Sequence, residues 1–253
     1  MGIQNRRPLI FFASCWWALF FSVSACDSKE STETIPHVQF RSSNSFPNQN
    51  GVQYKKRYTF TQNMFSRRSH LFLQAMGKYR GKPDTHYLEI GVHEGRSFFW
   101  VLENIMTHPT STLTAIDLFD TGQGTFKPTE TYGDHREFKR TFFNNVKRSG
   151  QQNRIRSRVG YSQQELQHFS PNTFDIIYID GCHSEACARE DAQLCWPLLK
   201  EGGRLLFDDY SARDYPGVYK AANELYRNHK ASMDVIHTGR VLVLEKKSSS
   251  GTQ

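Results

Sequence analysis

Residues 88–97, LEIGVHEGRS, combine an acidic residue with two glycines in a spacing that suits ligand binding. The candidate binding residues are Glu89, Gly91, Gly95 and Ser97, in the pattern E-x-G-x-x-x-G. Glycine lets the backbone approach a ligand closely, and a following helix N-terminus offers free N–H groups to a carboxylate or phosphate. Because the pattern is not G-x-G-x-x-G, a nicotinamide cofactor is disfavoured. Tight packing of a strand on a helix is the alternative interpretation of these glycines.

Two further groups have the chemistry to hold a nucleoside. Asp117 ends an apolar run 26 positions after Gly91, where a carboxylate can accept hydrogen bonds from both ribose hydroxyls. Asp120 competes for this role but is more typical of a loop or a cap. Ser162 and Gln163 follow the next strand-like run, and their small polar side chains can bond the edge of adenine. A helix cap is the alternative role for Ser162.

Carboxylates also follow two later apolar runs. Asp180 is followed three residues later by His183, and Asp208 and Asp209 end the next run. Neighbouring strands would bring the three carboxylates together, where a hard divalent cation such as Mg²⁺ would offset their repulsion. The alternative is that one carboxylate caps a helix and another faces water. His183 is a candidate base because an imidazole can take a proton from a substrate hydroxyl, although a lone histidine is often structural.

These residues need a scaffold that brings them to one edge, and the alternation of elements predicts one. Apolar strands are expected at 86–90, 113–117, 155–159, 174–179 and 204–207, with a closing hairpin of 233–236 and 241–244. Helices are expected at 58–79, 95–106, 134–146, 163–169, 185–199 and 217–229. This order predicts an α/β fold with a mostly parallel sheet covered on both faces. Ligands bind such sheets beyond the carboxyl ends of the strands, directly after which the candidate residues lie.

The five groups in this order resemble the class I methyltransferases that use S-adenosylmethionine. The resemblance covers roughly residues 79–247, and it is nearest to the small-molecule O-methyltransferases of the catechol type and to bacterial enzymes with D-G-x-H after the fourth strand. It implies a Rossmann-like sheet of seven strands in the order 3-2-1-4-5-7-6, with strand 7 antiparallel. The implied reaction is direct attack of a substrate oxygen on the methyl carbon of the sulfonium.

The resemblance also implies a role for each candidate residue. It places the methionine part of the cofactor at Glu89, Gly91, Gly95 and Ser97, the ribose at Asp117, and the adenine at Ser162 and Gln163. It places a cation at Asp180, Asp208 and Asp209, and the catalytic groups at His183 and Asp180. The family usually has Asn at the last metal position and, in the catechol enzyme, a lysine base where His183 stands. The extra charge of Asp209 and the identity of the base are therefore departures from the family pattern.

Composition and charge limit the classes of molecule that the protein is expected to bind. The 253 residues are 38% hydrophobic and 23% charged, as in an ordinary globular protein, with a formal net charge of +7. Part of the excess lies between residues 136 and 158, and we interpret it as a solvated helix face followed by an edge strand. Aromatic residues are not interleaved with these charges, and the Asn/Asp-Pro-Pro-aromatic tetrapeptide of nucleic-acid methyltransferases is absent after the fourth strand. We therefore expect a small-molecule acceptor and no nucleic acid.

The N-terminal 26 residues have the pattern of an export signal. Arg6 and Arg7 precede an uncharged run from Pro8 to Ala25, which ends at Cys26 as in a bacterial lipoprotein signal. An uncleaved anchor is the alternative, because 18 residues can just span a bilayer. We expect a membrane-associated, exported domain, or a cytoplasmic one if this segment is not used. S-adenosylmethionine is made inside the cell, which conflicts with export.

The remaining expectations concern organisation. Residues 1–26 are the signal or anchor, 27–57 a flexible linker, 58–247 the methyltransferase domain and 248–253 a disordered tail. Residues 119–135 form a long connection that suits either a substrate lid or an insertion. Cys182, Cys187 and Cys195 are expected to be inert thiols. A catalytically inactive nucleoside-binding module is the alternative function, and the oligomeric state stays open.

Overall fold

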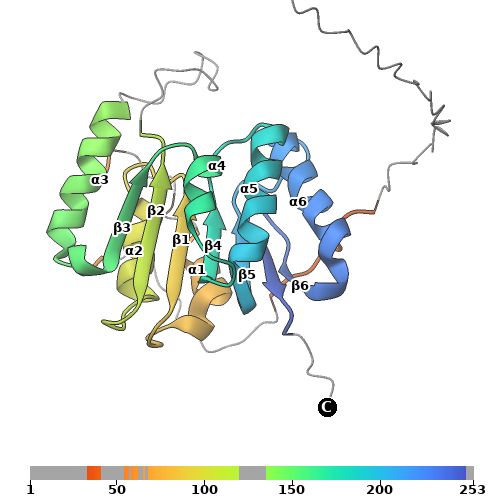
Figure 1. Ribbon diagram of the computed structural model, residues 1–253, viewed down its shortest axis with the longest axis horizontal. Coiled ribbons are helices and arrows are strands. Elements are labelled where there is room, and N and C mark those ends of the chain that lie inside the picture. The colour runs from red at the N-terminus through yellow and green to blue at the C-terminus, as the bar shows by residue number, and fades with distance from the viewer. Residues whose placement is uncertain are drawn as a thin grey trace, which may run out of the picture. The chain divides into compact units, whose positions relative to one another are not determined.

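The chain builds a seven-stranded sheet in the order β3-β2-β1-β4-β5-β7-β6, as the resemblance implies (Figure 1). The computed structural model describes residues 33–40, 54–56, 58–61, 65, 68–119 and 135–248. The strands are β1 His86–Ile90, β2 Thr112–Asp117, β3 Ile155–Val159, β4 Phe174–Ile179, β5 Leu199–Phe207, β6 Met233–His237 and β7 Leu242–Lys246. β7 runs antiparallel to both of its neighbours, and the other pairs are parallel.

Helices cover both faces of the sheet. They are α1 Ser69–Met76, α2 Arg96–Asn104, α3 His135–Ser149, α4 Ser162–Glu165, α5 Glu185–Leu198 and α6 Pro216–His229. Short 3-10 turns lie at Gly77–Tyr79, Gln152–Arg154, Leu166–His168 and Lys230–Ser232. β1 and β4 are neighbours in the centre of the sheet, but the chain leaves them in opposite directions. The connection after β1 leads to β2 on one side, and the connection after β4 leads to β5 on the other, so the two connections diverge at the carboxyl ends of these strands. Such a divergence is where open α/β sheets bind their ligands.

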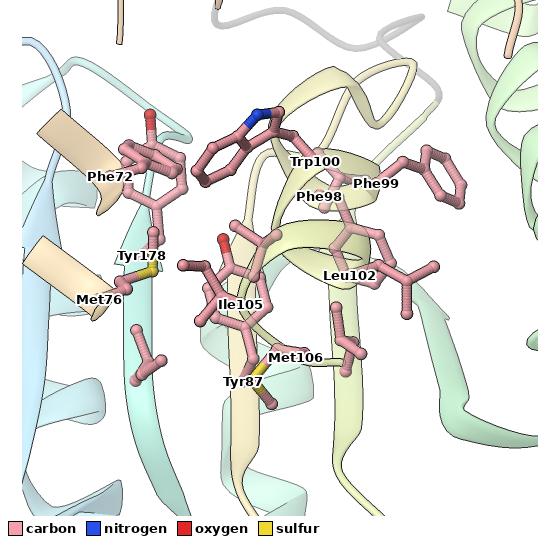
Figure 2. Close-up of a cluster of buried hydrophobic side chains, with 14 of the residues drawn as sticks. Phe72, Met76, Tyr87, Phe98, Phe99, Trp100, Leu102, Ile105, Met106 and Tyr178 are labelled. Atoms are coloured by element: carbon pink, nitrogen blue, oxygen red, sulfur yellow. The ribbon is translucent and has the colours of Figure 1, made fainter. Parts of the chain in front are cut away.

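Alternating side chains of the central strands enter two separate cores. Tyr87 and Tyr178 pack with Phe72 of α1 and Phe98 of α2 in one cluster (Figure 2). Leu88 and neighbouring apolar residues of the sheet pack in a second cluster with residues of α5 and α6. Burying a side chain of this size contributes roughly 1.5–3 kcal/mol, so the two cores anchor the strands whose ends carry the site.

The predicted helix at 58–79 is much shorter in the structure. Only Ser69–Met76 is α-helical, and the described residues before Arg68 are not. The backbone N–H groups of Lys55 and Lys56 donate instead to the Glu103 carboxylate, at 2.5 and 3.1 Å. The N–H group of Thr61 donates to Glu94 at 2.7 Å. Because side chains of other elements accept these hydrogen bonds, Lys55, Lys56 and Thr61 lie along the domain and not in a helix.

Residues 33–40, within the segment predicted as a flexible linker, lie in extended conformation against the domain. The N–H of Ile35 donates to the Asn223 side chain on α6 at 2.7 Å, and Ile35 is buried. Val38 and Thr238 exchange hydrogen bonds, with the Thr238 N–H donating to Val38 O at 2.7 Å. These contacts hold the segment on the domain.

Strand β5 begins five residues before the predicted strand. Leu199 pairs with Phe174 directly after α5, and the register then shifts, so that Arg204 pairs with Ile176. Gly202, with a φ of 70°, lies in the irregular stretch between these two pairings. Gly202 and Gly203, which directly precede the predicted strand, therefore lie within β5.

The cysteine prediction is wrong for two of its three residues. Cys182 and Cys187 form a disulfide with Cα atoms 6.0 Å apart, while Cys195 is a buried free thiol, as expected. The five-residue separation brings the sulfur atoms together because Cys182 lies in the turn before α5 and Cys187 in its first turn. The predicted signal segment and most of the 119–135 connection lie outside the described residues. Among the described residues, no helix is long and apolar enough to cross a membrane.

Candidate active site

A cavity of about 690 Å³ opens over the carboxyl ends of β1, β2, β4 and β5. Most of the predicted site residues line it, from both the nucleoside and the carboxylate groups: Gly91, Asp117, Ser162, Gln163, Asp180, His183, Asp208 and Asp209. Ser97 lines a smaller neighbouring cavity of about 50 Å³, which shares Gly91 and Asp180 with the first. The topology thus brings residues from distant parts of the chain to one edge, as predicted.

Gly91 forms the close turn at the end of β1. Its φ is 83°, and a Cβ atom there would lie 2.1 Å from the carbonyl oxygen of Asp180. The two strand ends therefore touch through backbone alone, and only glycine fits. Gly95 has a φ of 84°, and a Cβ there would lie 2.5 Å from the Phe99 ring. Gly95 does not line the main cavity, so its position follows from packing of the turn on α2.

Glu89 lies beneath this turn and not in the main cavity. Its carboxyl group is fully buried and accepts hydrogen bonds from the Tyr87 hydroxyl, at 2.6 Å, and from the Ser97 hydroxyl. Burial raises the pKa of Glu89 to about 8. The arrangement ties the end of β1 to the first turn of α2, and the predicted role of Glu89 at the methionine part of the cofactor stays a prediction.

Asp117 ends β2, the strand next to β1, and lines the same cavity as Gly91. Its carboxylate accepts the backbone N–H groups of His93 and Phe119, each at 2.8 Å. These bonds fix the carboxylate between the connections that follow β1 and β2. A carboxylate so held can accept the hydroxyls of a ribose without first being ordered.

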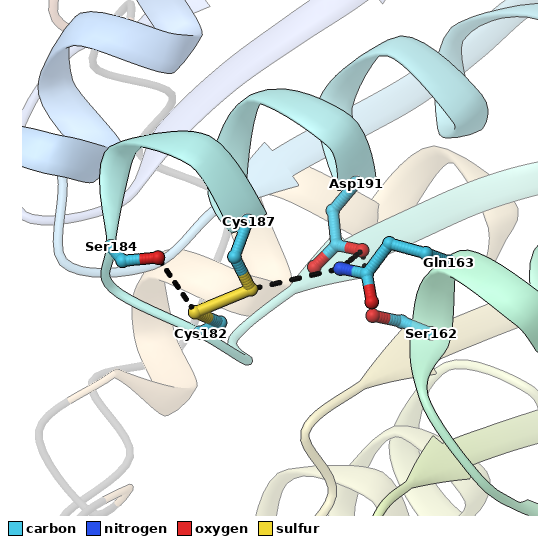
Figure 3. Close-up of a disulfide and its surroundings, with 6 residues drawn as sticks. All are labelled: Ser162, Gln163, Cys182, Ser184, Cys187 and Asp191. Atoms are coloured by element: carbon cyan, nitrogen blue, oxygen red, sulfur yellow. Dashed lines mark hydrogen bonds between the residues drawn. A yellow bond between two sulfur atoms is a disulfide. The ribbon is translucent and has the colours of Figure 1, made fainter. Parts of the chain in front are cut away.

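Ser162 and Gln163 open α4, and both of their side chains contact Asp191 of α5 (Figure 3). The Ser162 hydroxyl donates to Asp191 Oδ1 at 2.6 Å, and the Gln163 amide donates to the same oxygen at 3.0 Å. The helix N-cap is Tyr161, without a side-chain bond, so the capping role considered for Ser162 is wrong. Burial raises the pKa of Asp191 to about 6.

The three carboxylates after β4 and β5 all line the cavity, but they have different partners. Asp208 is buried, accepts the Tyr178 hydroxyl at 2.7 Å and pairs with Arg68 at 2.9 Å. One potential ligand atom each from Asp180, His183 and Asp209 lies within 4.8 Å of the others. His183 therefore joins Asp180 and Asp209 in a group that could hold a cation, and the metal-binding role of Asp208 stays a prediction.

Two arginines supply positive charge at the same place. Arg68 and Arg240 each reach Asp209 Oδ1 at 3.2 Å, while His183 Nε2 lies 3.4 Å from Asp209 Oδ2. Burial alone would raise the pKa of Asp209, but His183 and the two arginines outweigh it and hold that pKa below its usual value. Burial raises the pKa of Asp180.

Sequence reasoning missed Arg68, Asp191, Tyr215 and Arg240. Tyr215 packs its ring 4.6 Å from that of His183, and Arg240 lies in the connection between β6 and β7. None of the four lies in the motifs after β1 to β5, so local spacing carried no signal for them. Only the closure of the sheet by β7 and the placement of α1 bring the two arginines to the site.

The fold and the cavity define a class of protein, an open α/β sheet with a candidate ligand site where the connections after β1 and β4 diverge. Residues 88–210 match the family model described as a methyltransferase domain. An uncharacterized protein of Acanthamoeba polyphaga mimivirus is 29% identical over 190 residues, which are 71% of this chain and 78% of the viral protein.

Solved structures share the fold at lower identity. A Corynebacterium glutamicum protein superimposes with a TM-score of 0.54 at 18% identity, over 72% of this chain and 82% of its own. A candidate O-methyltransferase from Klebsiella pneumoniae gives 0.51 at 14% identity, over 72% and 80%. The family match identifies a methyltransferase domain at residues 88–210, and the sheet order together with the solved structures shows that its fold is that of the class I methyltransferases.

Proposed function

We propose that this methyltransferase transfers the methyl group of S-adenosylmethionine to an oxygen of a small molecule, such as a phenol or a sugar. The observation that supports this most is the composition of the 690 Å³ cavity. The predicted nucleoside-binding residues Asp117, Ser162 and Gln163 line it as a first group, and Asp180, His183 and Asp209 line it as a second. A donor bound along the first group would present its sulfonium methyl to an acceptor held at the second.

In the proposed reaction, the acceptor oxygen attacks the methyl carbon in line with the breaking carbon–sulfur bond. The bond's electron pair stays on sulfur, and the hydroxyl proton passes to the His183 imidazole. Asp209 orients that ring through Nε2, at 3.4 Å, and Tyr215 packs against it. Alignment of the reactants can lower the barrier by several kcal/mol, on the order of what intramolecular reactions gain.

A divalent cation is the alternative way to activate the acceptor. The donor set of Asp180, His183 and Asp209 suits such an ion, which would lower the pKa of the attacking hydroxyl. If a ring nitrogen of His183 bound the ion, that nitrogen could not also accept the proton of the acceptor hydroxyl. Because Arg68 and Arg240 already neutralise Asp209, we favour the imidazole base.

Cofactor binding tests the proposal most directly. Calorimetric titration of the full-length protein with S-adenosylhomocysteine should show micromolar binding. Asp117→Ala should weaken it by at least about tenfold, since a charged hydrogen bond to the ribose contributes about 1.5–3 kcal/mol. Glu137→Gln, an exposed change on α3, is the matched control. Failure of the folded wild-type protein to bind would overturn the assignment of the cavity as the cofactor site.

A screen of hydroxylated acceptors, followed by metal removal, separates the two activation modes. With an imidazole base, chelation by EDTA should leave the rate unchanged, and His183→Gln should reduce kcat by about 100-fold with little change in cofactor affinity. If EDTA abolishes the rate and Mg²⁺ restores it, the cation acts at Asp180, His183 and Asp209.

We also propose that the domain is exported and attached to a membrane through its N-terminal segment. The Cys182–Cys187 disulfide supports this placement, because disulfides persist in oxidising compartments. Cell fractionation of the native chain and of Cys26→Ser would test it. Release of the variant from the membrane fraction is expected if Cys26 is lipidated, whereas a wild-type protein found in the cytoplasm would contradict export.

A further inference from the structure

Asp191 is a carboxyl group that the proposed chemistry does not use. It lies in the middle of α5, is completely buried and does not line the cavity. Its Oδ2 atom has no hydrogen-bond partner among the described residues. Oδ1 accepts from both Ser162 and Gln163, which do line the cavity. A buried carboxylate is costly unless it is hydrogen-bonded, so these two donors matter for its placement.

The bonds to Asp191 fix which way the two side chains face. An ionised carboxylate only accepts hydrogen bonds, so both partners must donate to it. The single hydroxyl hydrogen of Ser162 is used in this way. The Gln163 amide nitrogen has two hydrogens, and its other neighbour is Cys187 Sγ at 3.6 Å (Figure 3). Neither side chain therefore retains a donor, and each can offer only an oxygen acceptor to a ligand.

From this arrangement we propose that Asp191 is a positioning residue which makes Ser162 and Gln163 present acceptors, and so selects a 6-aminopurine over a 6-oxopurine. The inference rests on the proposed placement of the nucleoside along Asp117, Ser162 and Gln163. A 6-amino group donates two hydrogens towards such acceptors. A 6-oxo group would face them with a third acceptor, which leaves buried polar groups unpaired.

The test compares S-adenosylhomocysteine with S-inosylhomocysteine, which differ at the purine 6-position. By calorimetry, the full-length wild-type protein should bind the adenosine compound at least about tenfold more tightly, as expected for a site that rejects an unpaired polar group. Asp191→Asn should bring the ratio of the two dissociation constants close to one. The asparagine amide can itself donate, so Ser162 and Gln163 are free to reverse and to donate to the ligand.

The matched control is Glu185→Gln, which removes a carboxylate from the same helix. Glu185 pairs with Arg189 and Lys220 and does not line the cavity, so the ratio should stay at its wild-type value. A folded Asp191→Asn protein with an unchanged ratio would overturn the proposal. Equal binding of the two compounds by the wild-type protein would overturn it as well, while leaving the cofactor site intact. Failure to bind either compound would count against the cofactor site itself.

A second measurement needs no variant and so does not depend on the folding of one. Burial raises the pKa of Asp191 to about 6, and a protonated carboxyl group gains a donor. The wild-type ratio should therefore fall between pH 7.5 and pH 5. The titratable neighbours of Asp191 on α5 are Glu190 and the buried thiol of Cys195, while Ser162, Gln163 and Gly181 carry no charge. A ratio that is constant over this range would contradict the proposed control by Asp191.

Discussion

At the scale of single residues, the site depends on carboxyl groups whose surroundings differ. Asp208 is buried against Arg68 and Tyr178, whereas Asp209 meets two arginines and a histidine. Removing one member of a buried ion pair costs about 3–5 kcal/mol because the other charge is left uncompensated. The two arginines therefore stabilise the fold by compensating the charges of Asp208 and Asp209, whether or not an acceptor is bound.

Glu89 makes a prediction about stability that does not depend on the ligand. Its pKa is about 8 in the fold, against 4.5 in the unfolded chain, because of burial. Between these values the folded protein keeps a proton that the unfolded chain releases, so the free energy of unfolding falls as pH rises. Glu89→Gln cannot ionise. Urea unfolding at pH 5.5, 6.5 and 7.5 should show the wild-type free energy falling relative to this variant, by at most about 1.4 kcal/mol per pH unit.

The exposed Glu137→Gln is again the control, and it should follow the wild-type curve at all three pH values. Parallel pH dependence of Glu89→Gln and the wild-type protein would show that Glu89 is already ionised in the fold.

At the scale of elements, the turn between β4 and α5 carries His183 and is closed by the Cys182–Cys187 disulfide. A bond across so short a loop stabilises the fold by about 2 kcal/mol in the chain-entropy treatment. Reductant should lower the free energy of unfolding of the wild-type protein by about that amount, and it should have no effect on the Cys182→Ser, Cys187→Ser double variant.

Chemical unfolding with and without dithiothreitol measures this effect. Cys195 does not complicate the result, because its thiol is buried and burial raises its pKa. If reductant leaves the wild-type curve unchanged, the two sulfur atoms are not bonded in the protein.

At the scale of the whole molecule, residues 33–40 connect the start of the described chain to its last elements. Asn223 accepts the N–H of Ile35 and donates to Tyr210 and Tyr219. Asn223→Ala should cost about 1–3 kcal/mol of unfolding free energy, because buried polar groups lose their partners. Hydrogen exchange should show lost protection of the Ile35 amide, while amides of β4 stay protected.

Asn228→Ala, an exposed change on the same helix, should alter neither stability nor exchange. Equal protection of Ile35 in the wild-type protein and in Asn223→Ala would mean that residues 33–40 do not lie on the domain in solution.

The basic residues between 136 and 158 are close together in the sequence but do not all face solvent in the fold. Arg154, in the basic stretch, is buried and donates to the carbonyl oxygens of Met106, His108 and Ser111. Arg158 pairs with Glu165 at 2.9 Å. Since part of the stretch is committed to the fold, it does not form a continuous basic surface, and the absence of nucleic-acid binding stays a prediction.

The sequence by itself determined the alternation of elements, the sheet order through its resemblance, and the residues that follow each strand. Hydrophobic periodicity and glycine turns are local signals, and the bounds of β1, β3 and β4 agree with their predicted ranges. The same locality explains why Gly91, Asp117 and Asp180 lie at one cavity, since parallel strands end at a common edge.

Only the tertiary structure decided which groups face one another. It placed Arg68 on Asp208 and Asp209, brought His183 together with Asp180 and Asp209, and set Asp191 against Ser162 and Gln163. It also bonded Cys182 to Cys187. These partners are distant in the sequence, or they meet only in one orientation of a side chain. Their pairing stabilises the protein only after the two cores have packed and brought the partners together. No local pattern records that pairing, because neither partner is constrained until the fold forms.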